Sequence, residues 1–378
     1  MTIIYVDVFT TSGVGLMERV RAFGLRVARP FGEEFRKVLV KNGLLSKELK
    51  PFEYNGLIHF PLSKRPSEEE MNILRGFSFE EGIWDFPLKP KARPRSLSEA
   101  LLGKLPPHIL AKIPKSFDVV GDVALLETDE DIATYGHIIG EGLRSMNSKI
   151  RLVLLKVSPI SGEYRVAKYL PIWGEGKTET VHKENGCLLS LDITKVFFTP
   201  RLSCERLRVA KLVKDQETVA DLFAGVGPFS VLIAKSVRDV VVHAVELNES
   251  AYNYLVRNIS LNRVFGKVVP HLGDARYVAS TVIKGKCDRV IMNLPFGSEL
   301  FLDAGSDALK AAGGVIHLYS TLKSSDVKEG AFLKVSNSLK RLGWGDVEQE
   351  GFRVVREVGP RVYNVVFDIR VSNRSRGP

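Results

Sequence analysis

The sequence has 378 residues, enough for two or three domains of ordinary size. Apolar residues make up 44% and charged residues 26%, a balance that excludes wholesale disorder, and no stretch approaches the ~18 apolar residues of a membrane-spanning helix. The 54 basic side chains outnumber the 44 acidic ones and give a net charge of +10. This excess favours a polyanionic partner such as nucleic acid, and a solvated basic surface is the alternative.

Cysteine and histidine patterns exclude two further classes. Cys187, Cys204 and Cys287 lie far apart without a CxxC pair, so we expect neither a disulfide framework nor a zinc finger. The 7 histidines show no HExxH or paired ligand spacing, which predicts no metal. The first residues, MTIIYVDVFT, lack the basic start and long apolar block of a signal peptide. We therefore expect a soluble, cytoplasmic protein.

Residues 1–86 are predicted to form a small α/β domain. A strand precedes a helix from about Glu33 to Lys41 that ends at Gly43, and LIHFPL forms a further strand. The next segment, PLKPKARPR at residues 87–95, is a linker stiffened by three prolines. Its basic side chains are predicted RNA contacts: Lys89, Lys91, Arg93 and Arg95.

Residues 96–199 are predicted to form an α+β domain. Helices broken by Pro106 and Pro107 come first, and FDVVGDVALLE is expected to be a strand with a central turn. A helix with an acidic first turn begins near Thr128. Two strands, RLVLLKVSP and EYRVAKYLPIWG, follow around the turn at Ser161 and Gly162.

Residues 200–378 alternate regularly between strands and helices. Strands are expected at ETVADLF, DVVVHAVEL, KVVPHLGD, CDRVIMNLP and GGVIHLYS, and helices separate them. This alternation predicts a mostly parallel sheet with right-handed crossovers. FRVVREV and RVYNVVFDIRV then form a hairpin around Gly359 and Pro360. A parallel sheet finished by an antiparallel hairpin resembles the Rossmann-like fold of class I S-adenosylmethionine-dependent methyltransferases.

A glycine-rich turn follows the first of these strands. The motif DLFAGVGPF contains Asp221, Gly225 and Gly227, and glycines let the backbone approach a ligand closely. Only two of the three glycines of a dinucleotide fingerprint are present, and Pro228 removes a backbone donor, which disfavours NAD. A plain strand-to-helix loop is the alternative. Glu246, 21 residues after Gly225 at the end of the second strand, is placed to bind ribose hydroxyls.

Polar residues also end the third and fourth strands. Asp274 follows the third strand and Asn293 the fourth, so both should lie in the same crevice as the turn. Their structural alternatives are a helix cap for Asp274 and a turn for Asn293 with Pro295. The motif NLPF is similar to the Asn-Pro-Pro-aromatic motif of amino-group methyltransferases, with Leu294 in place of a proline. We also assign Phe223, Leu247 and Pro295 to the cofactor pocket.

Longer motifs carry a specific resemblance. Residues 178–210, TETVHKENGCLLSLDITKVFFTPRLSCERLRVA, together with DLFAGVGPFS and MNLPF, resemble the archaeal and eukaryotic tRNA (guanine-N1)-methyltransferases that act at position 37. FRKVLVKNGLLSKELKP and PKSFDVVGDVALLE extend the resemblance over nearly the whole chain. It implies S-adenosylmethionine as cofactor, tRNA as partner, a reaction without a metal, and a first domain that checks the outer corner of the tRNA.

The resemblance also implies roles for individual residues. Guanine N1 carries a proton that must leave as N1 becomes nucleophilic, while negative charge develops on O6. Glu205 matches the proposed general base of the family, and Arg165 its oxyanion-stabilising arginine. A structural alternative pairs Glu205 with Arg201 or Arg208 and leaves Arg165 as an exposed strand residue. Asn293 completes the catalytic group, and Asn185 is expected to shape the site where RNA binds.

Two other functions stay open at this point. One is a wyosine-pathway tRNA enzyme, either an aminocarboxypropyl transferase or a bifunctional enzyme that also methylates a tricyclic intermediate. The other is a non-catalytic tRNA-binding protein that keeps the fold. Either way, we expect a monomer.

Overall fold

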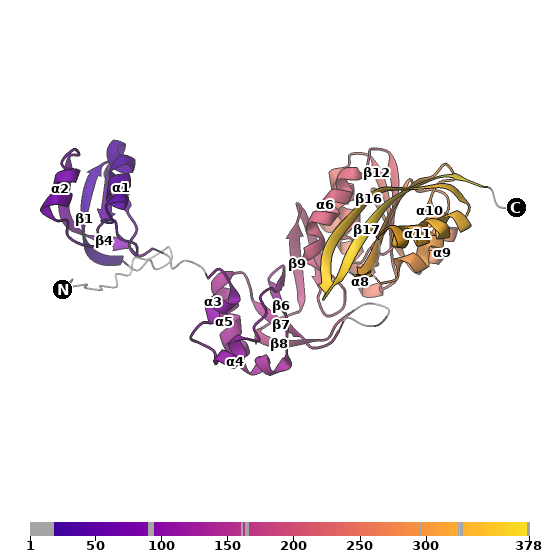
Figure 1. The fold of residues 1–378 in the computed structure, drawn as a ribbon, viewed down its shortest axis with the longest axis horizontal. Coiled ribbons are helices and arrows are strands. Elements are labelled where there is room, and N and C mark those ends of the chain that lie inside the picture. Colours follow the sequence, from indigo (N-terminus) through magenta and orange to yellow (C-terminus); the bar gives the residue numbers. More distant parts are fainter. Residues whose placement is uncertain are drawn as a thin grey trace. The chain divides into compact units, whose positions relative to one another are not determined.

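The computed structural model describes residues 19–89, 94–159, 162, 166–294, 296–323, 325 and 328–375. Lys91, Arg93, Arg165 and Pro295, which the sequence singled out, lie outside these residues. Contacts divide the chain into two compact units, residues 1–93 and residues 94–378 (Figure 1). The predicted boundary between a second and a third domain near residue 200 stays a prediction, because the second unit is continuous across it.

The first unit is an antiparallel sheet covered by two helices. Its strand order is β2-β3-β1-β4. The elements are β1 (Arg19–Ala28), α1 (Gly32–Lys41), β2 (Phe52–Tyr54), β3 (Leu57–Pro61), α2 (Glu68–Leu74) and β4 (Phe79–Pro87). Phe35 of α1 and Leu74 of α2 share one core with Leu25 and Phe60 of the sheet, so both helices bury their apolar sides against it. A capping box of Ser67 and Glu70 begins α2.

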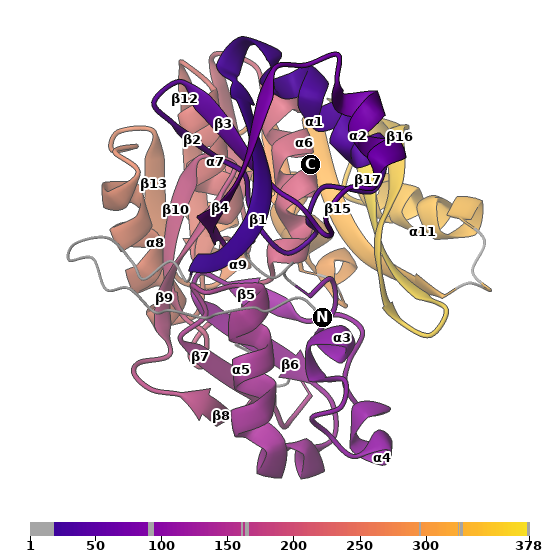
Figure 2. The ribbon, with the colours of Figure 1, turned by 90° about the vertical axis from the view of Figure 1, so that its left-hand side faces the viewer.

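The second unit begins with a smaller sheet of order β5-β6-β7-β8, in which only β6 and β7 run parallel. Its elements are α3 (Leu97–Leu101), α4 (Pro107–Leu110), β5 (Asp118–Val120), β6 (Val123–Glu127), α5 (Gly136–Met146), β7 (Leu152–Lys156) and β8 (Tyr169–Gly174). Helix α5 packs on β8 and on α3 (Figure 2). Gly140 permits this approach, since a Cβ there would lie 1.9 Å from Trp173.

A two-stranded hairpin, β9 (Glu179–Glu184) and β10 (Cys187–Asp192), continues the unit. Two asparagines bind the free edge of β10: Asn258 in helix α8 (Glu249–Leu261) and Asn262, its C-cap. Asn258 accepts from the Ser190 N–H at 2.7 Å and donates to the Ser190 carbonyl, and Asn262 makes the same pair with Leu188. The hairpin, which precedes residue 200, is therefore fastened to the body that follows it.

The largest sheet has seven strands in the order β13-β12-β11-β14-β15-β17-β16. The strands are β11 (Glu217–Asp221), β12 (Val240–Glu246), β13 (Val268–Leu272), β14 (Arg289–Met292), β15 (Gly314–Lys323), β16 (Trp344–Gly359) and β17 (Val362–Arg374). The first five in this order are parallel, and β17 and β16 form the antiparallel hairpin. The predicted fold class is confirmed, and the strand order reverses between β11 and β14.

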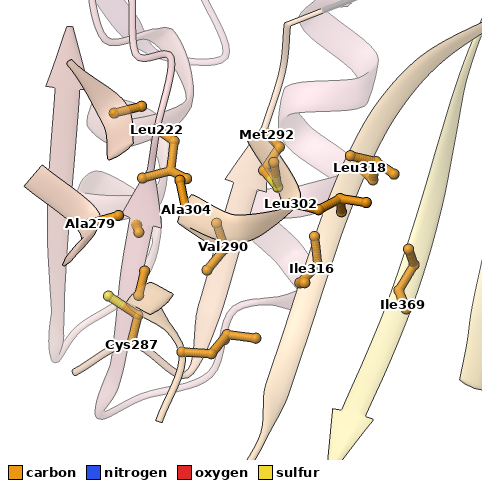
Figure 3. Close-up of a cluster of buried hydrophobic side chains, with 14 of the residues drawn as sticks. Leu222, Ala279, Cys287, Val290, Met292, Leu302, Ala304, Ile316, Leu318 and Ile369 are labelled. Carbon is orange, nitrogen blue, oxygen red and sulfur yellow. The ribbon is translucent and has the colours of Figure 1, made fainter. Parts of the chain in front are cut away.

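Helices cover both faces of this sheet. One face carries α6 (Ser203–Leu212), α7 (Pro228–Ser236) and α8, and the other carries α9 (Ala275–Thr281), α10 (Leu302–Ala308) and α11 (Lys328–Arg341). Val290 and Met292 of β14 meet Leu302 and Ala304 of α10 in the second core (Figure 3). Burial of apolar area on both faces stabilises the sheet and fixes the carboxyl ends of its strands.

Candidate functional site

The glycine-rich turn joins β11 to α7. Gly225 (φ 57°) and Gly227 (φ 84°) both take the left-handed conformation that side chains disfavour. A Cβ at Gly227 would lie 2.4 Å from Leu255 Cδ1, so this glycine also allows close packing of α7 on α8. Gly225 faces open space, because a Cβ at this position would have no neighbouring atom within 4 Å. The turn therefore presents bare backbone at the end of the strand.

Glu246, at the end of β12, lies directly beside this turn. Its carboxylate accepts from the N–H of Gly225 at 2.7 Å and from the N–H of Asn248 at 2.8 Å. Burial raises the pKa of Glu246, and backbone N–H donors of Asn248, Gly225 and Leu247 oppose that effect. Each carboxylate oxygen keeps room for another donor, as a ribose-binding carboxylate requires.

Asp221 ends β11 beneath the turn and is completely buried. Ser230 Oγ donates to its Oδ2 at 2.7 Å, while Oδ1 has no hydrogen-bond partner in the described parts of the chain. Burial raises the pKa of Asp221 to about 7, and the hydrogen bond from Ser230 opposes this shift. An unpaired buried acceptor is costly unless a ligand supplies the donor.

Asn293 follows β14, the neighbour of β11 in the sheet. Its Oδ1 is likewise buried without a partner among the residues that the structure describes. The backbone around it is held by Ser298, whose hydroxyl donates to the Met292 carbonyl at 2.8 Å and accepts from the Leu294 N–H. Phe296, which follows, has φ 67° and is 65% exposed. The side-chain carbonyl oxygen of Asn293 is therefore available to a ligand.

The other predicted cofactor residues differ in how many contacts they already make within the protein. Asp274 Oδ1 accepts from the N–H groups of Arg276 and Tyr277 and so caps α9, which is the structural alternative raised by the sequence. Phe223 packs edge-on against Phe301 with ring centroids 5.1 Å apart. Leu247 is 39% exposed beside Glu246. These three follow the carboxyl ends of β11, β12 and β13, and Asp274 is already used as a helix cap.

Glu205, the predicted base, lies in the first turn of α6 and is 4% exposed. Arg208 donates to both carboxylate oxygens, at 2.7 Å to Oε1 and 2.9 Å to Oε2, and the Tyr319 hydroxyl donates to Oε1 at 2.8 Å. The pairing with Arg208 is the structural alternative named above, whereas Arg201 pairs with Asp118 instead. Within the described chain Oε2 accepts only from Arg208, so it retains an acceptor lone pair.

A cleft of 1020 Å³ opens between the smaller sheet and the β16–β17 hairpin. Phe198, Tyr169 and Phe296 supply aromatic lining, and Arg201 and Arg356 supply positive charge. The Nε of Arg356 is buried and has no partner among the described residues. Val166 is also part of the cleft wall. Its size and mixed lining suit an aromatic, partly anionic ligand.

The predicted RNA contacts that the structure describes take different local roles. Lys89 Nζ donates to the Ser46 carbonyl at 2.9 Å within the first unit. Arg95 precedes α3, where its backbone N–H donates to Glu99. Asn185 takes φ 46° in the β9–β10 turn and donates to the carbonyl and hydroxyl of Ser203, the first residue of α6. Asn185 therefore orients the helix that carries Glu205.

Sequence reasoning named Arg208 as an alternative partner of Glu205 but missed the other groups around it. Tyr319, His317 and Asp368 are polar residues inside otherwise apolar strands, GGVIHLYS and VVFDIRV, and that interruption was the available signal. Arg356 gave no such signal, because charged residues are common in the strand that carries it.

The seven-stranded order β13-β12-β11-β14-β15-β17-β16, parallel except for the final hairpin, is the fold of class I methyltransferases. Three family models match successive parts of the chain: the tRNA methyltransferase 5 N-terminal domain at residues 24–70, the TYW2 N-terminal domain at residues 97–178 and the TRM5/TYW2 methyltransferase domain at residues 180–343. The chain belongs to the TRM5/TYW2 methyltransferase family, which confirms the resemblance found in the sequence.

Individual relatives match over most of their length. The tRNA (guanine(37)-N(1))-methyltransferase Trm5b of Pyrococcus abyssi is 37% identical over 90% of this chain and 96% of its own, and Trm5b of Methanocaldococcus jannaschii is 33% identical over 93% and 99%. Among solved structures, a complex of aTrm5 with tRNALeu matches 93% of this chain and 100% of its own, with 33% identity and a TM-score of 0.75.

Two further properties of the described residues bear on partners. No helix among them is long and apolar enough to cross a membrane. Within those same residues, no group of three or more His, Cys, Asp or Glu side chains could hold a metal ion.

Proposed function

We propose that this protein transfers a methyl group from S-adenosylmethionine to N1 of guanosine 37 in tRNA. The observation that carries the proposal is similarity over nearly the full length to two enzymes named for this reaction. The net charge of +10 suits the tRNA partner, and we extend the proposal to a cytoplasmic monomer.

The first unit separates this function from the aminocarboxypropyl transfer of the wyosine pathway. Two tRNA(Phe) (4-demethylwyosine(37)-C(7)) aminocarboxypropyltransferases, from M. jannaschii and Pyrococcus horikoshii, match 97% of their own length but only 67% and 75% of this chain. The Trm5b enzymes match 93% and 90%. A tRNA methyltransferase 5 N-terminal domain within the first unit therefore favours the reaction of the Trm5b enzymes over aminocarboxypropyl transfer.

The strand-end residues fit the cofactor. Asp221 Oδ1 and Asn293 Oδ1 are buried acceptors without partners among the described residues, and the ammonium and hydroxyl groups of S-adenosylmethionine are donors. Glu246 would bind the ribose, the open backbone at Gly225 would admit the ligand, and Phe223 and Leu247 would contact its apolar surfaces. When bound, S-adenosylmethionine supplies a methyl group on a positively charged sulfur.

Glu205 provides the base in this proposal. The N1 proton of guanine must move to an acceptor as the nitrogen becomes nucleophilic, and Oε2 of Glu205 keeps a free lone pair. Arg208 and Tyr319 hold the carboxylate in one orientation, which lowers the reorganisation needed for proton transfer. Stabilisation of O6 by Arg165 and a catalytic contact by Asn293 complete the assignment carried over from the family resemblance.

One experiment tests the function directly. The protein is incubated with methyl-labelled S-adenosylmethionine and unmodified tRNA carrying either G or A at position 37, and the labelled nucleoside is identified after digestion. We expect N1-methylguanosine from the G substrate and no label from the A substrate. Absence of N1-methylguanosine from the G substrate would overturn the proposal.

A second activity has its own supporting observation. Residues 97–178 match the TYW2 N-terminal domain, and a bifunctional tRNA (guanine(37)-N(1))/4-demethylwyosine(37)-methyltransferase, Taw22 of Nanoarchaeum equitans, is 28% identical over 67% of this chain. Supplying tRNA that carries the tricyclic demethylwyosine intermediate tests for this activity. A methylated tricyclic base supports a bifunctional enzyme, and an unlabelled one restricts the protein to guanosine.

A further inference from the structure

A continuous row of buried and half-buried polar groups runs from Glu217, the first residue of β11, to Glu205. Glu217 accepts from Arg289 Nε at 2.7 Å, and Arg289 Nη1 lies 2.7 Å from His317 Nε2. His317 Nδ1 lies 2.5 Å from Asp368 Oδ1. The row then reaches Arg208, which donates to Asp368 Oδ2 at 2.6 Å and also to Glu205. Neighbouring strands place these groups side by side, since His317 on β15 and Asp368 on β17 are register partners.

The hydrogen-bond partners of His317 fix its protonation. Arg289 is always a donor, so His317 Nε2 must accept and cannot carry a proton. The single imidazole proton therefore sits on Nδ1 and is donated to Asp368 Oδ1. Burial lowers the pKa of His317, and the hydrogen bond to Asp368 only partly opposes this shift. His317 is thus a neutral link of fixed tautomer between two charged side chains.

Asp368 stays ionised in this arrangement. Burial opposes its ionisation, but hydrogen bonds from His317 and Arg208 outweigh burial and hold the pKa of Asp368 well below its ordinary value. Arg208 consequently faces two carboxylates at once. Its Nη1 bonds to Asp368, its Nε bonds to Glu205, and its Nη2 bonds to both. One positive charge is divided between two negative ones.

We propose that Asp368 is a positioning residue that competes with Glu205 for Arg208, while His317, whose tautomer Arg289 fixes, takes part of the Asp368 charge in a hydrogen bond. The proposal rests on the general-base role of Glu205 stated above. If Arg208 served Glu205 alone, the ion pair would favour the ionised carboxylate and make it a weaker proton acceptor. Division of the arginine leaves the carboxylate oriented but incompletely neutralised.

The remaining charged groups around these residues are few. Tyr319 on β15 donates to Glu205, and burial holds the pKa of Tyr319 well above its ordinary value, so its hydroxyl stays neutral. Arg353 on β16 lies 4.0 Å from Glu205 Oε2 with an exposed side chain, where solvent screens its charge. Asp368 is therefore the carboxylate positioned to offset Arg208.

The test is the pH dependence of single-turnover methyl transfer to G37 tRNA. Replacing Asp368 by Asn removes the competing charge, so the acid limb of the pH–rate profile should move to lower pH by roughly one unit, with a slower plateau. His317→Leu, which deletes the donor to Asp368 and strengthens its hold on Arg208, should move the limb upward. His317→Asn is the matched control: it keeps an amide donor near the place of Nδ1 and should leave the limb in place.

Folding of each variant is checked by thermal melting and by calorimetric binding of S-adenosylmethionine. A folded Asp368→Asn protein whose acid limb overlays that of the wild type would overturn the inference. If Asp368→Asn does not fold, the direction of the His317→Leu shift decides: an upward shift supports the inference, and any other result overturns it.

Nitrogen NMR of histidine-labelled wild-type protein decides without any variant at position 368. The His317 signal, assigned by its loss in His317→Asn, should show a proton on Nδ1 throughout the acid range. A titrating ring or an Nε2 proton would contradict the inference. Glu205→Gln in the same kinetic assay distinguishes failure of this inference from failure of the proposed function. If the wild type and Glu205→Gln are both active, Glu205 is not the base. If the wild type itself is inactive, the proposed function is wrong.

Discussion

The carboxyl ends of the parallel strands and the surroundings of Glu205 differ in how their buried polar groups are hydrogen-bonded. At the strand ends, Oδ1 of Asp221 and Oδ1 of Asn293 each have no partner among the described residues. The Glu205 carboxylate, by contrast, accepts two hydrogen bonds from Arg208 and one from Tyr319, and only Oε2 keeps a free lone pair. A buried acceptor without a partner lowers the stability of the fold, and a ligand that donates to it restores that free energy. A hydrogen-bonded carboxylate is instead fixed in one orientation. The proposed cofactor site and the proposed base thus differ in how many of their hydrogen bonds the protein itself supplies.

The largest effect is expected from a substitution at Glu205, whose carboxylate is fully hydrogen-bonded except at Oε2. Glu205→Gln keeps the shape of the side chain but cannot take up a proton, so methyl transfer should slow by roughly 10²–10⁴-fold. Single-turnover kinetics measure the rate, and calorimetry should show cofactor affinity unchanged. Loss of cofactor binding together with activity would instead indicate that Glu205 supports the fold.

A smaller loss is expected on the unpaired side. Glu246→Ala removes the acceptor beside the glycine turn, and affinity for S-adenosylmethionine should fall by about 10–100-fold. Glu249→Ala, which replaces an exposed carboxylate a few positions further on, is the matched control and should bind as the wild type does. Equal affinity of the two variants would exclude Glu246 from the cofactor site.

The buried charge of Asp221 makes a pH-dependent contribution to stability. Because its pKa is raised to about 7 from an ordinary value near 4, the folded protein holds the proton more tightly than the unfolded chain does. This group therefore stabilises the ligand-free fold at low pH, and that contribution is lost as pH rises toward and through 7.

Asp221→Asn should accordingly gain stability relative to the wild type as pH rises from about 4 to 8, by a few kcal/mol at most. Chemical denaturation of both proteins across this range, without cofactor, measures the difference. A pH-independent difference would mean that Asp221 stays ionised in the folded protein.

Another effect concerns the shape of the turn itself. Gly227→Ala adds a Cβ in left-handed backbone and against Leu255, so the free energy of unfolding should drop by about 2–4 kcal/mol. Gly266→Ala provides the control, because Gly266 has a similar φ of 77° but open space around it. It should lose only about 1–2 kcal/mol. Similar losses at both positions would show that packing against Leu255 is unimportant.

The sequence predicted the large sheet well because periodicity and strand ends are local properties. Glu246 and Asn293 could be placed at one crevice once their strands were recognised as parallel, since parallel strands end at the same edge. The network around Glu205 could not be derived in this way. His317 and Asp368 meet only because β17 inserts antiparallel beside β15, and that register depends on contacts 51 residues apart in the chain. Local patterns carry no record of such pairings.

The two asparagines that hold the β9–β10 hairpin can both bind it because the rise of a helix over four residues is close to the advance of a strand over two. Four residues along a helix rise about 6 Å, and two residues along a strand advance about 6.6 Å. Asn258 and Asn262 therefore meet Ser190 and Leu188 in step, and each amide pairs with one residue as a neighbouring strand would. A helix here completes the edge of a sheet. A one-residue slip of the hairpin would break both pairs, so the helical repeat sets the place of the Asn185 turn and, through it, the start of α6.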